Sequence, residues 1–149
     1  MLVPLLAISV IVSLPARRVP SAAECVSVSG DMILADSRVA LVFSGRVVNR
    51  VSVGKPDRPT YRATFDVDRV WKGAVTKRMD IYVPELSPEM PRFDQGREYV
   101  VVANRVVDSK LRQDLGLADA DGPAFAAQQC SGDLPPDIRK QLGAGSRPK

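Results

Sequence analysis

Apolar and polar residues alternate along much of the chain with a period of two, which is typical of β-strands with one buried face. The first such segment spans residues 39–53. Gly45 interrupts its apolar series, and a glycine inside a long strand marks a bulge or a sharp bend. We therefore expect a long strand that bends near Gly45. Its inward residues are expected to be Val39, Leu41, Phe43, Val47, Val51 and Val53.

Three further segments follow the same rule. Residues 61–71 alternate until the phase slips at 69–71, which predicts a second bulge. Residues 79–83 form a short strand, and residues 99–107 are apolar on both faces, which predicts the most covered strand. The inward residues of the second and third segments are expected to be Tyr61, Ala63, Phe65, Val67, Met79, Ile81 and Val83.

Helical signals are short. Ser29 is a good N-cap for a helix that ends near residue 35, a turn is expected at 109–115, and residues 136–142 begin with a proline and stop at Gly143. Residues 124–129 predict a final strand or a helical turn, and residues 143–149 are expected to be disordered. Several short strands, mid-strand bulges and little helix predict an all-β fold with minor helix. Either a small closed barrel or a sandwich fits, and the mid-strand bulges favour the barrel.

The first residues of the chain resemble a secretory signal. Residues 2–14 are mostly apolar but short for a membrane span, and small residues precede a cleavage point between Ala23 and Glu24. We expect residues 1–23 to be a signal peptide and the mature chain to be secreted, periplasmic or at the cell surface, without a membrane span. A short membrane anchor is the alternative.

The chain has two cysteines, Cys25 and Cys130, far apart in the sequence. Their separation excludes a Cys-x-x-Cys redox site and a four-thiolate zinc site. In an oxidising compartment, one disulfide between them is the expected state. Two unrelated buried thiols are the alternative.

The absence of histidine restricts the chemistry. It removes the commonest general base and the usual ligand of catalytic zinc. No catalytic, cofactor-binding or metal-ligating residues are proposed, and the chain is not expected to be an enzyme. Its formal charge of +4 falls to +2 when Arg17 and Arg18 leave with the signal, so nucleic acid is not an expected partner.

Four sequence runs together resemble bacterial members of the tissue-inhibitor-of-metalloproteinases (TIMP) and netrin-module superfamily. They are residues 40–47 (ALVFSGRV), 65–73 (FDVDRVWKG), 93–101 (FDQGREYVV) and 130–132 (CSG). The resemblance covers about residues 25–134. It implies an OB-like closed barrel of about five strands over residues 24–134, with one disulfide. Residues 135–149 would then form a short helix and a disordered tail.

The resemblance also implies a site. In the inhibitors, the amine and carbonyl of an N-terminal cysteine chelate the zinc of a target metalloprotease, and the next side chain enters its specificity pocket. Carried over here, Cys25 would chelate, Val26 would enter the pocket, and Glu24 and Ser27 would flank the contact. The expected cleavage leaves Glu24 in front of Cys25, and this extra residue would block the amine.

The first functional hypothesis is therefore a secreted, non-enzymatic module that binds a protein, an extracellular metalloprotease in the first instance. The alternatives are an adhesion or polyanion-binding module, or a purely structural domain. For polyanion binding, the candidate basic face consists of Arg46, Arg62, Arg69 and Lys72.

Two acidic pairs have ordinary explanations. Asp66 and Asp68 share one strand face with Arg62, which is typical of a solvated surface. Asp119 and Asp121 resemble half of a calcium loop, but the remaining ligands of such a loop are missing, which favours a polar turn.

Overall fold

The computed structural model describes residues 28–85, 90–118 and 121–149. The expected signal peptide, residues 1–23, lies outside these ranges. So do Glu24, Cys25, Val26 and Ser27, and Asp119. The expectations that concern these residues therefore stay predictions.

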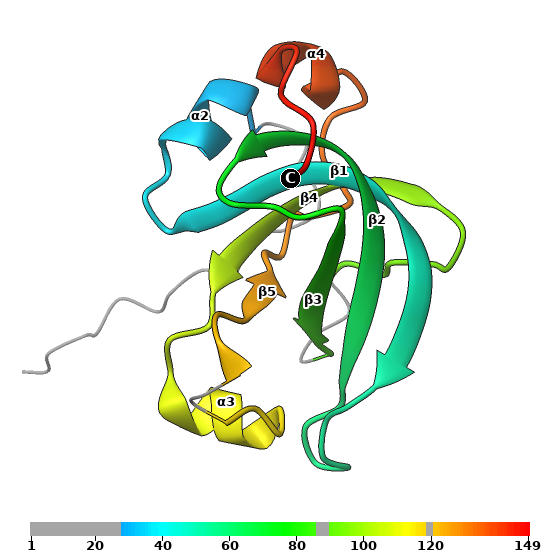
Figure 1. The fold of residues 1–149 in the computed structure, drawn as a ribbon, viewed down its shortest axis with the longest axis vertical. Coiled ribbons are helices and arrows are strands. Elements are labelled where there is room, and N and C mark those ends of the chain that lie inside the picture. Colours follow the sequence, from blue (N-terminus) through cyan, green and yellow to red (C-terminus); the bar gives the residue numbers. More distant parts are fainter. Residues whose placement is uncertain (1–27, 86–89, 119–120) are drawn as a thin grey trace, which may run out of the picture.

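Five strands form a closed barrel in the order β1-β2-β3-β5-β4, with β4 returning to β1 (Figure 1). Neighbouring strands are antiparallel except for β3 and β5, which run parallel. The predicted closed barrel is thus confirmed, as a mixed sheet. The strands are β1 (Val39–Ser52), β2 (Thr60–Lys72), β3 (Arg78–Pro84), β4 (Glu98–Arg105) and β5 (Phe125–Ala127).

Short helices cover the two ends of the barrel. At one end, α2 (Gly30–Ala35) lies beside α4 (Ile138–Leu142), and at the other end α3 (Ser109–Asp114) lies near β5 (Figure 1). The side chain of Ser29 caps α2 as expected, and Gly143 ends α4 with a positive φ of 82°. None of the helices in the described ranges is long and apolar enough to cross a membrane.

Both predicted bulges lie between β1 and β2. Gly45 faces Val67 while Ser44 faces Arg69, so Asp68 is an extra residue in β2. In the same way, Trp71 is extra between the partners of Val42 and Phe43. A Cβ atom on Gly45 would lie 2.5 Å from the carbonyl oxygen of Asp66, so the two backbones can approach this closely only at a glycine.

The barrel interior is built around an aromatic row. Phe43, Phe65, Phe93 and Tyr99 pack edge to face, with successive ring centroids 5.5, 5.1 and 5.0 Å apart. The inward residues predicted for β2 and β3 contribute to the same core, with Tyr61, Ala63, Phe65, Ile81 and Val83 buried and Val67 and Met79 partly buried.

Three inward predictions for residues 39–53 are wrong. Val39 packs under α2 and α4 rather than in the interior, and Val51 is exposed. Val53 lies just after β1 and packs with Tyr82 on the outside of the barrel. Each lies beyond a further register shift, one between Val39 and Leu41 against β4 and one at Val48 against β2. A shift of one residue moves the following side chains to the other face of a strand.

Apolar side chains also pack on the outside of the barrel. Val42 and Val102 are covered by Ile33, Ile138 and Leu142 from the two helices at that end. The predicted covering of β4 on both faces is confirmed, because Val101, Val102 and Ala103 are at most 2% exposed. At the opposite end, Tyr82 points outward as expected but is buried by Val106, Leu115 and Ala124.

Residues 143–149 differ from the expectation of a disordered tail. The backbones of Val70 and Ser146 exchange two hydrogen bonds of 2.8 and 2.7 Å, and the indole Nε1 of Trp71 donates to the Gly143 carbonyl at 2.9 Å. The cause is the limited pairing of β2 with β3, which runs from Thr60 to Asp66 and stops there. The last residues of β2 leave backbone groups that the tail satisfies.

Substitution of Gly45 by alanine should destabilise the protein by about 3 kcal/mol, because the added methyl group forces β1 away from β2. Gly116→Ala is the control, since Gly116 has a positive φ but open space around it. It should cost about 1 kcal/mol. Urea unfolding of both variants gives the comparison, and equal costs would contradict the role given to the close approach.

A chain that ends at Leu142 should lose about 1–2 kcal/mol, through the hydrogen bonds of residues 143–149 to β2. Trp71 is the single tryptophan, so its fluorescence reports this contact directly. We expect a red shift on truncation and none in the control Lys140→Ala, which alters an exposed residue of α4. An unchanged Trp71 spectrum would show that the tail does not dock.

Candidate functional site

Cys130 lies just after β5 and lines a groove between α2 and the barrel wall. The groove has a volume of about 370 Å³. Val28, the first described residue, lines it too. Cys130 is not a free cysteine, but Cys25 lies outside the described residues, so their pairing stays a prediction. Cys25 lies three positions before Val28, a span of at most roughly 11 Å. A bridge to Cys130 is therefore within reach of the chain.

The lining of the groove is mainly apolar. Ile33, Val39 and Val102 are buried along it, and Leu134 is partly buried. Met32 of α2 also lines the groove, and its large apolar side chain is 62% exposed. An apolar surface of this kind beside the N-terminal segment suits contact with another polypeptide.

A polar cluster fixes the far end of α2 at the rim of the groove. The carboxylate of Asp36 accepts hydrogen bonds from the backbone N–H of Arg38 at 2.9 Å and from its guanidinium at 3.0 and 2.8 Å. These bonds lower the pKa of Asp36 from 3.8 to about 2. Lys72 donates to the carbonyls of Leu34 and Asp36, both at 2.9 Å, and so binds the helix end to β2.

The residues of the candidate basic face do not gather into one cationic surface. The Lys72 ammonium donates to two carbonyls at the end of α2. Arg46 donates to the Gly96 carbonyl at 2.8 Å, and the guanidinium of Arg62 lies 3.8 Å from the Asp80 carboxylate. Arg69 lies in a different pocket, beside the tail. The sequence predicts that these residues lie on neighbouring strands, but it does not indicate which carbonyls and carboxylates they bind.

Other basic residues of the barrel are also paired. Arg78 binds Asp66 at 2.9 Å, and Lys55 and Arg58 both bind Asp114, at 3.1 and 3.0 Å. The Lys55 hydrogen bond lowers the pKa of Asp114 below its ordinary value. These pairs leave little uncompensated charge along the face of β2 and β3.

The acidic pairs have the ordinary roles that sequence analysis favoured, as far as the structure describes them. Asp66 and Asp68 are exposed, and Asp66 is ion-paired. Asp121 accepts a hydrogen bond from the Ala118 N–H at 2.6 Å, which is a turn contact. In the described ranges, no three acidic or cysteine side chains come together as a possible metal site.

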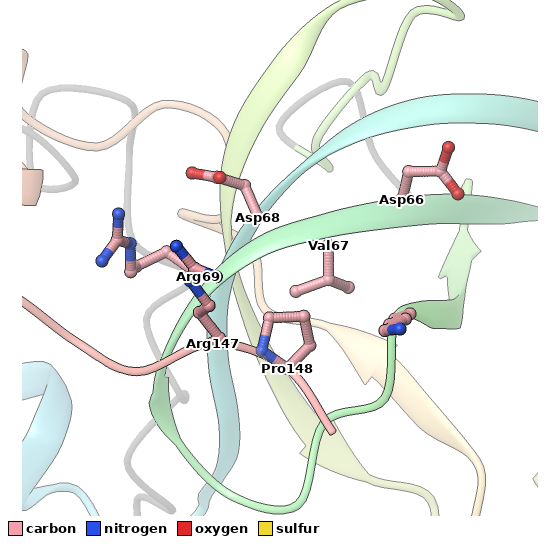
Figure 2. Close-up of a pocket in the computed structure, with 7 residues that line it drawn as sticks. Asp66, Val67, Asp68, Arg69, Arg147 and Pro148 are labelled. Atoms are coloured by element: carbon pink, nitrogen blue, oxygen red, sulfur yellow. The ribbon is translucent and has the colours of Figure 1, made fainter.

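One pocket was missed by sequence reasoning. The tail that was expected to be disordered supplies Arg147 and Pro148, which line this pocket together with Arg69 and Lys77. Figure 2 shows Arg69, Arg147 and Pro148 beside the end of β2. The only sequence signal is the concentration of basic residues at both places. They are brought together by backbone hydrogen bonds and by the Trp71–Gly143 contact, which form no local motif in the sequence.

Replacement of Asp36 by asparagine should lower stability at pH 7. Because the pKa is lower in the folded protein than the ordinary 3.8, the carboxylate stabilises the fold fully above about pH 4, and this contribution is lost as the pH falls through about 2. Urea unfolding at pH 7 and pH 2 measures the difference between the two proteins. A difference that stays the same at pH 2 would contradict the assigned pKa.

Comparison with known proteins adds no relative: no family model, no curated protein and no solved structure matches the chain. The chain is thus a small, mostly β protein whose five strands close into a mixed barrel with short helices.

Proposed function

We propose that the mature chain is a secreted, non-enzymatic module that binds a protein partner through the N-terminal segment around Cys25. One observation carries the proposal: Val28 and Cys130 line the same apolar groove at one end of the barrel. A Cys25–Cys130 bridge would hold the intervening Val26 and Ser27 on a short span at the edge of this groove. A segment held in this way loses little conformational entropy when it binds.

The strand arrangement supports the finer assignment to an OB-like barrel of the TIMP and netrin-module superfamily. OB-folds are five-stranded barrels. Here β1 pairs with both β2 and β4, and β3 runs parallel to β5. The first and last helices of the described ranges, α2 and α4, are linked by a 2.8 Å hydrogen bond from the Gly30 N–H to the Gln141 side chain. This contact holds residues 30 and 141 together at one end of the barrel.

The bridge would also stabilise the fold. Cys25 and Cys130 enclose nearly the whole barrel, and on the chain-entropy model closure of a loop on the order of 100 residues contributes about 4–5 kcal/mol. A small exported domain with one modest core gains a large part of its stability from such a link.

The partner we propose first is an extracellular zinc metalloprotease. A free α-amine has an ordinary pKa near about 7.7–8.0, so at neutral pH part of it carries the lone pair that a metal needs. The nitrogen of a peptide bond from Glu24 to Cys25 has no such lone pair. Inhibition by chelation therefore requires a mature chain that begins at Cys25.

Polyanion binding along β2 and β3 is less well supported. Arg62 and Arg78 lie against Asp80 and Asp66, and these acids would repel a long polyanion. We therefore prefer the protein partner over the adhesion alternative.

The test compares two oxidised chains that differ by one residue, the first beginning at Cys25 and the second at Glu24. Each is titrated against a thermolysin-type zinc protease, with a serine protease as the control target. The chain that begins at Cys25 should inhibit the zinc enzyme at least about 100-fold more strongly, which is the expected scale for the loss of a metal ligand.

Equal inhibition by the two chains would contradict chelation through the Cys25 amine. A Cys25 chain that binds neither protease would remove the metalloprotease as the partner. Inhibition of the serine protease to the same extent would also contradict the proposal.

A further inference from the structure

The end of β2 and residues 143–149 form an open pocket with a volume of about 530 Å³ (Figure 2). Its lining residues are Asp66, Val67, Asp68, Arg69, Lys77, Arg147 and Pro148. We propose that this pocket binds a doubly charged oxyanion, a sulfate or phosphate group, between Arg69, Lys77 and Arg147. This site is separate from the groove beside Cys130 and does not depend on the function proposed above.

The three cationic side chains are uncompensated. In the described part of the chain, Arg69, Lys77 and Arg147 have neither an ion pair nor a side-chain hydrogen bond. This contrasts with the basic residues along β2 and β3, where Arg62 and Arg78 both face acids. Cations that are gathered in one pocket without a partner favour a ligand that supplies the missing negative charge.

The charge balance of the pocket suits a dianion. The Arg78 guanidinium, 2.9 Å away, compensates Asp66, so Asp68 is the one opposing charge among the lining residues. Among the lining side chains, three cations against one uncompensated carboxylate leave a surplus of two positive charges. In Figure 2 the carboxylates of Asp66 and Asp68 lie on one side of the β2 ribbon, while Arg147 and Pro148 lie on the other.

The backbone holds the cations in place before a ligand arrives. Arg147 follows Ser146, which is paired in both directions with Val70. The N–H of Lys77 donates to a backbone oxygen of Lys149 at 3.2 Å, which fixes the other side of the tail. Arg69 lies beside the extra residue Asp68, and bulges of this kind redirect side chains. Less ordering is therefore required on binding than for arginines on a free tail.

Residue chemistry favours an oxyanion over a halide. Each guanidinium presents parallel N–H donors that match two oxygens of a sulfate or phosphate group. Val67 and Pro148 give the pocket an apolar side that is not a ligand for a hydrated cation. Because the pocket is open, its affinity should fall as the salt concentration rises.

The experiment titrates the full mature chain with sodium sulfate and, separately, with sodium phosphate at pH 8, at constant ionic strength with sodium chloride as the balancing salt. Backbone amide NMR shifts are the readout. Saturable shifts are expected at residues 67–70, 77, 146, 147 and 149, and replacement of the dianion by chloride should reverse them. Equal saturation by both dianions identifies the shared oxyanion chemistry, and saturation by one alone identifies the source.

Four variants separate the site from general charge effects. Arg69→Gln and Arg147→Gln should each weaken binding roughly tenfold, the scale of a charge-assisted hydrogen bond. Asp68→Asn should strengthen it several-fold because it removes the opposing charge. The matched control Arg92→Gln, which alters an exposed arginine outside the pocket, should leave the affinity unchanged.

Three outcomes would overturn the proposal. The first is the absence of saturable shifts with either dianion. The second is equal weakening by Arg147→Gln and Arg92→Gln, which would reduce the effect to net charge. The third is shifts that saturate only with heparin and do not change in Arg147→Gln, which would indicate a long polyanion at another surface.

Discussion

The close approach of β1 and β2 at Gly45 is the constraint on which the rest of the structure depends. A strand of 14 residues cannot pair with β2 on one side and β4 on the other, within one small barrel, unless it bends sharply. The missing side chain at Gly45 and the extra residue Asp68 opposite provide that bend. They also bring Phe43 and Phe65 into edge-to-face contact in the interior.

Strand alternation determines what lies outside the barrel. Val42 lies between the inward Leu41 and Phe43, so it faces away from the interior and is covered by α2 and α4. This cover places Val28 and Cys130 along one groove, at the end of the barrel where the partner-binding segment is proposed. On the other edge of β2, pairing with β3 ends at Asp66, which leaves the end of β2 free for residues 143–149.

Much of the barrel could be predicted from sequence, because alternation is a local property. Tyr61, Ala63 and Phe65 face the interior, as the alternation of apolar and polar residues along β2 predicts. The failures at Val39 and Val51 have a different origin. Their orientation depends on register shifts against partner strands, which a single strand does not encode.

The sites were less predictable for a related reason. Lys72 belongs to a basic run in the sequence, but in the fold it meets two carbonyls at the end of α2. Docking of residues 143–149 depends on backbone hydrogen bonds, on the Trp71 indole that donates to the Gly143 carbonyl, and on Gly145, where a Cβ atom would lie 2.8 Å from the Val70 carbonyl oxygen. Contacts of this kind become visible only when the chain has been folded.

The central claim is that Cys25 and Cys130 are joined in the exported protein, so that the N-terminal segment is tethered beside the groove. Peptide mapping by mass spectrometry, without reduction and after the free thiols have been blocked, tests this claim most directly. The account predicts one peptide pair linked through Cys25 and Cys130, from a chain that lacks residues 1–23. Two blocked, unlinked thiols in the native exported protein would contradict it.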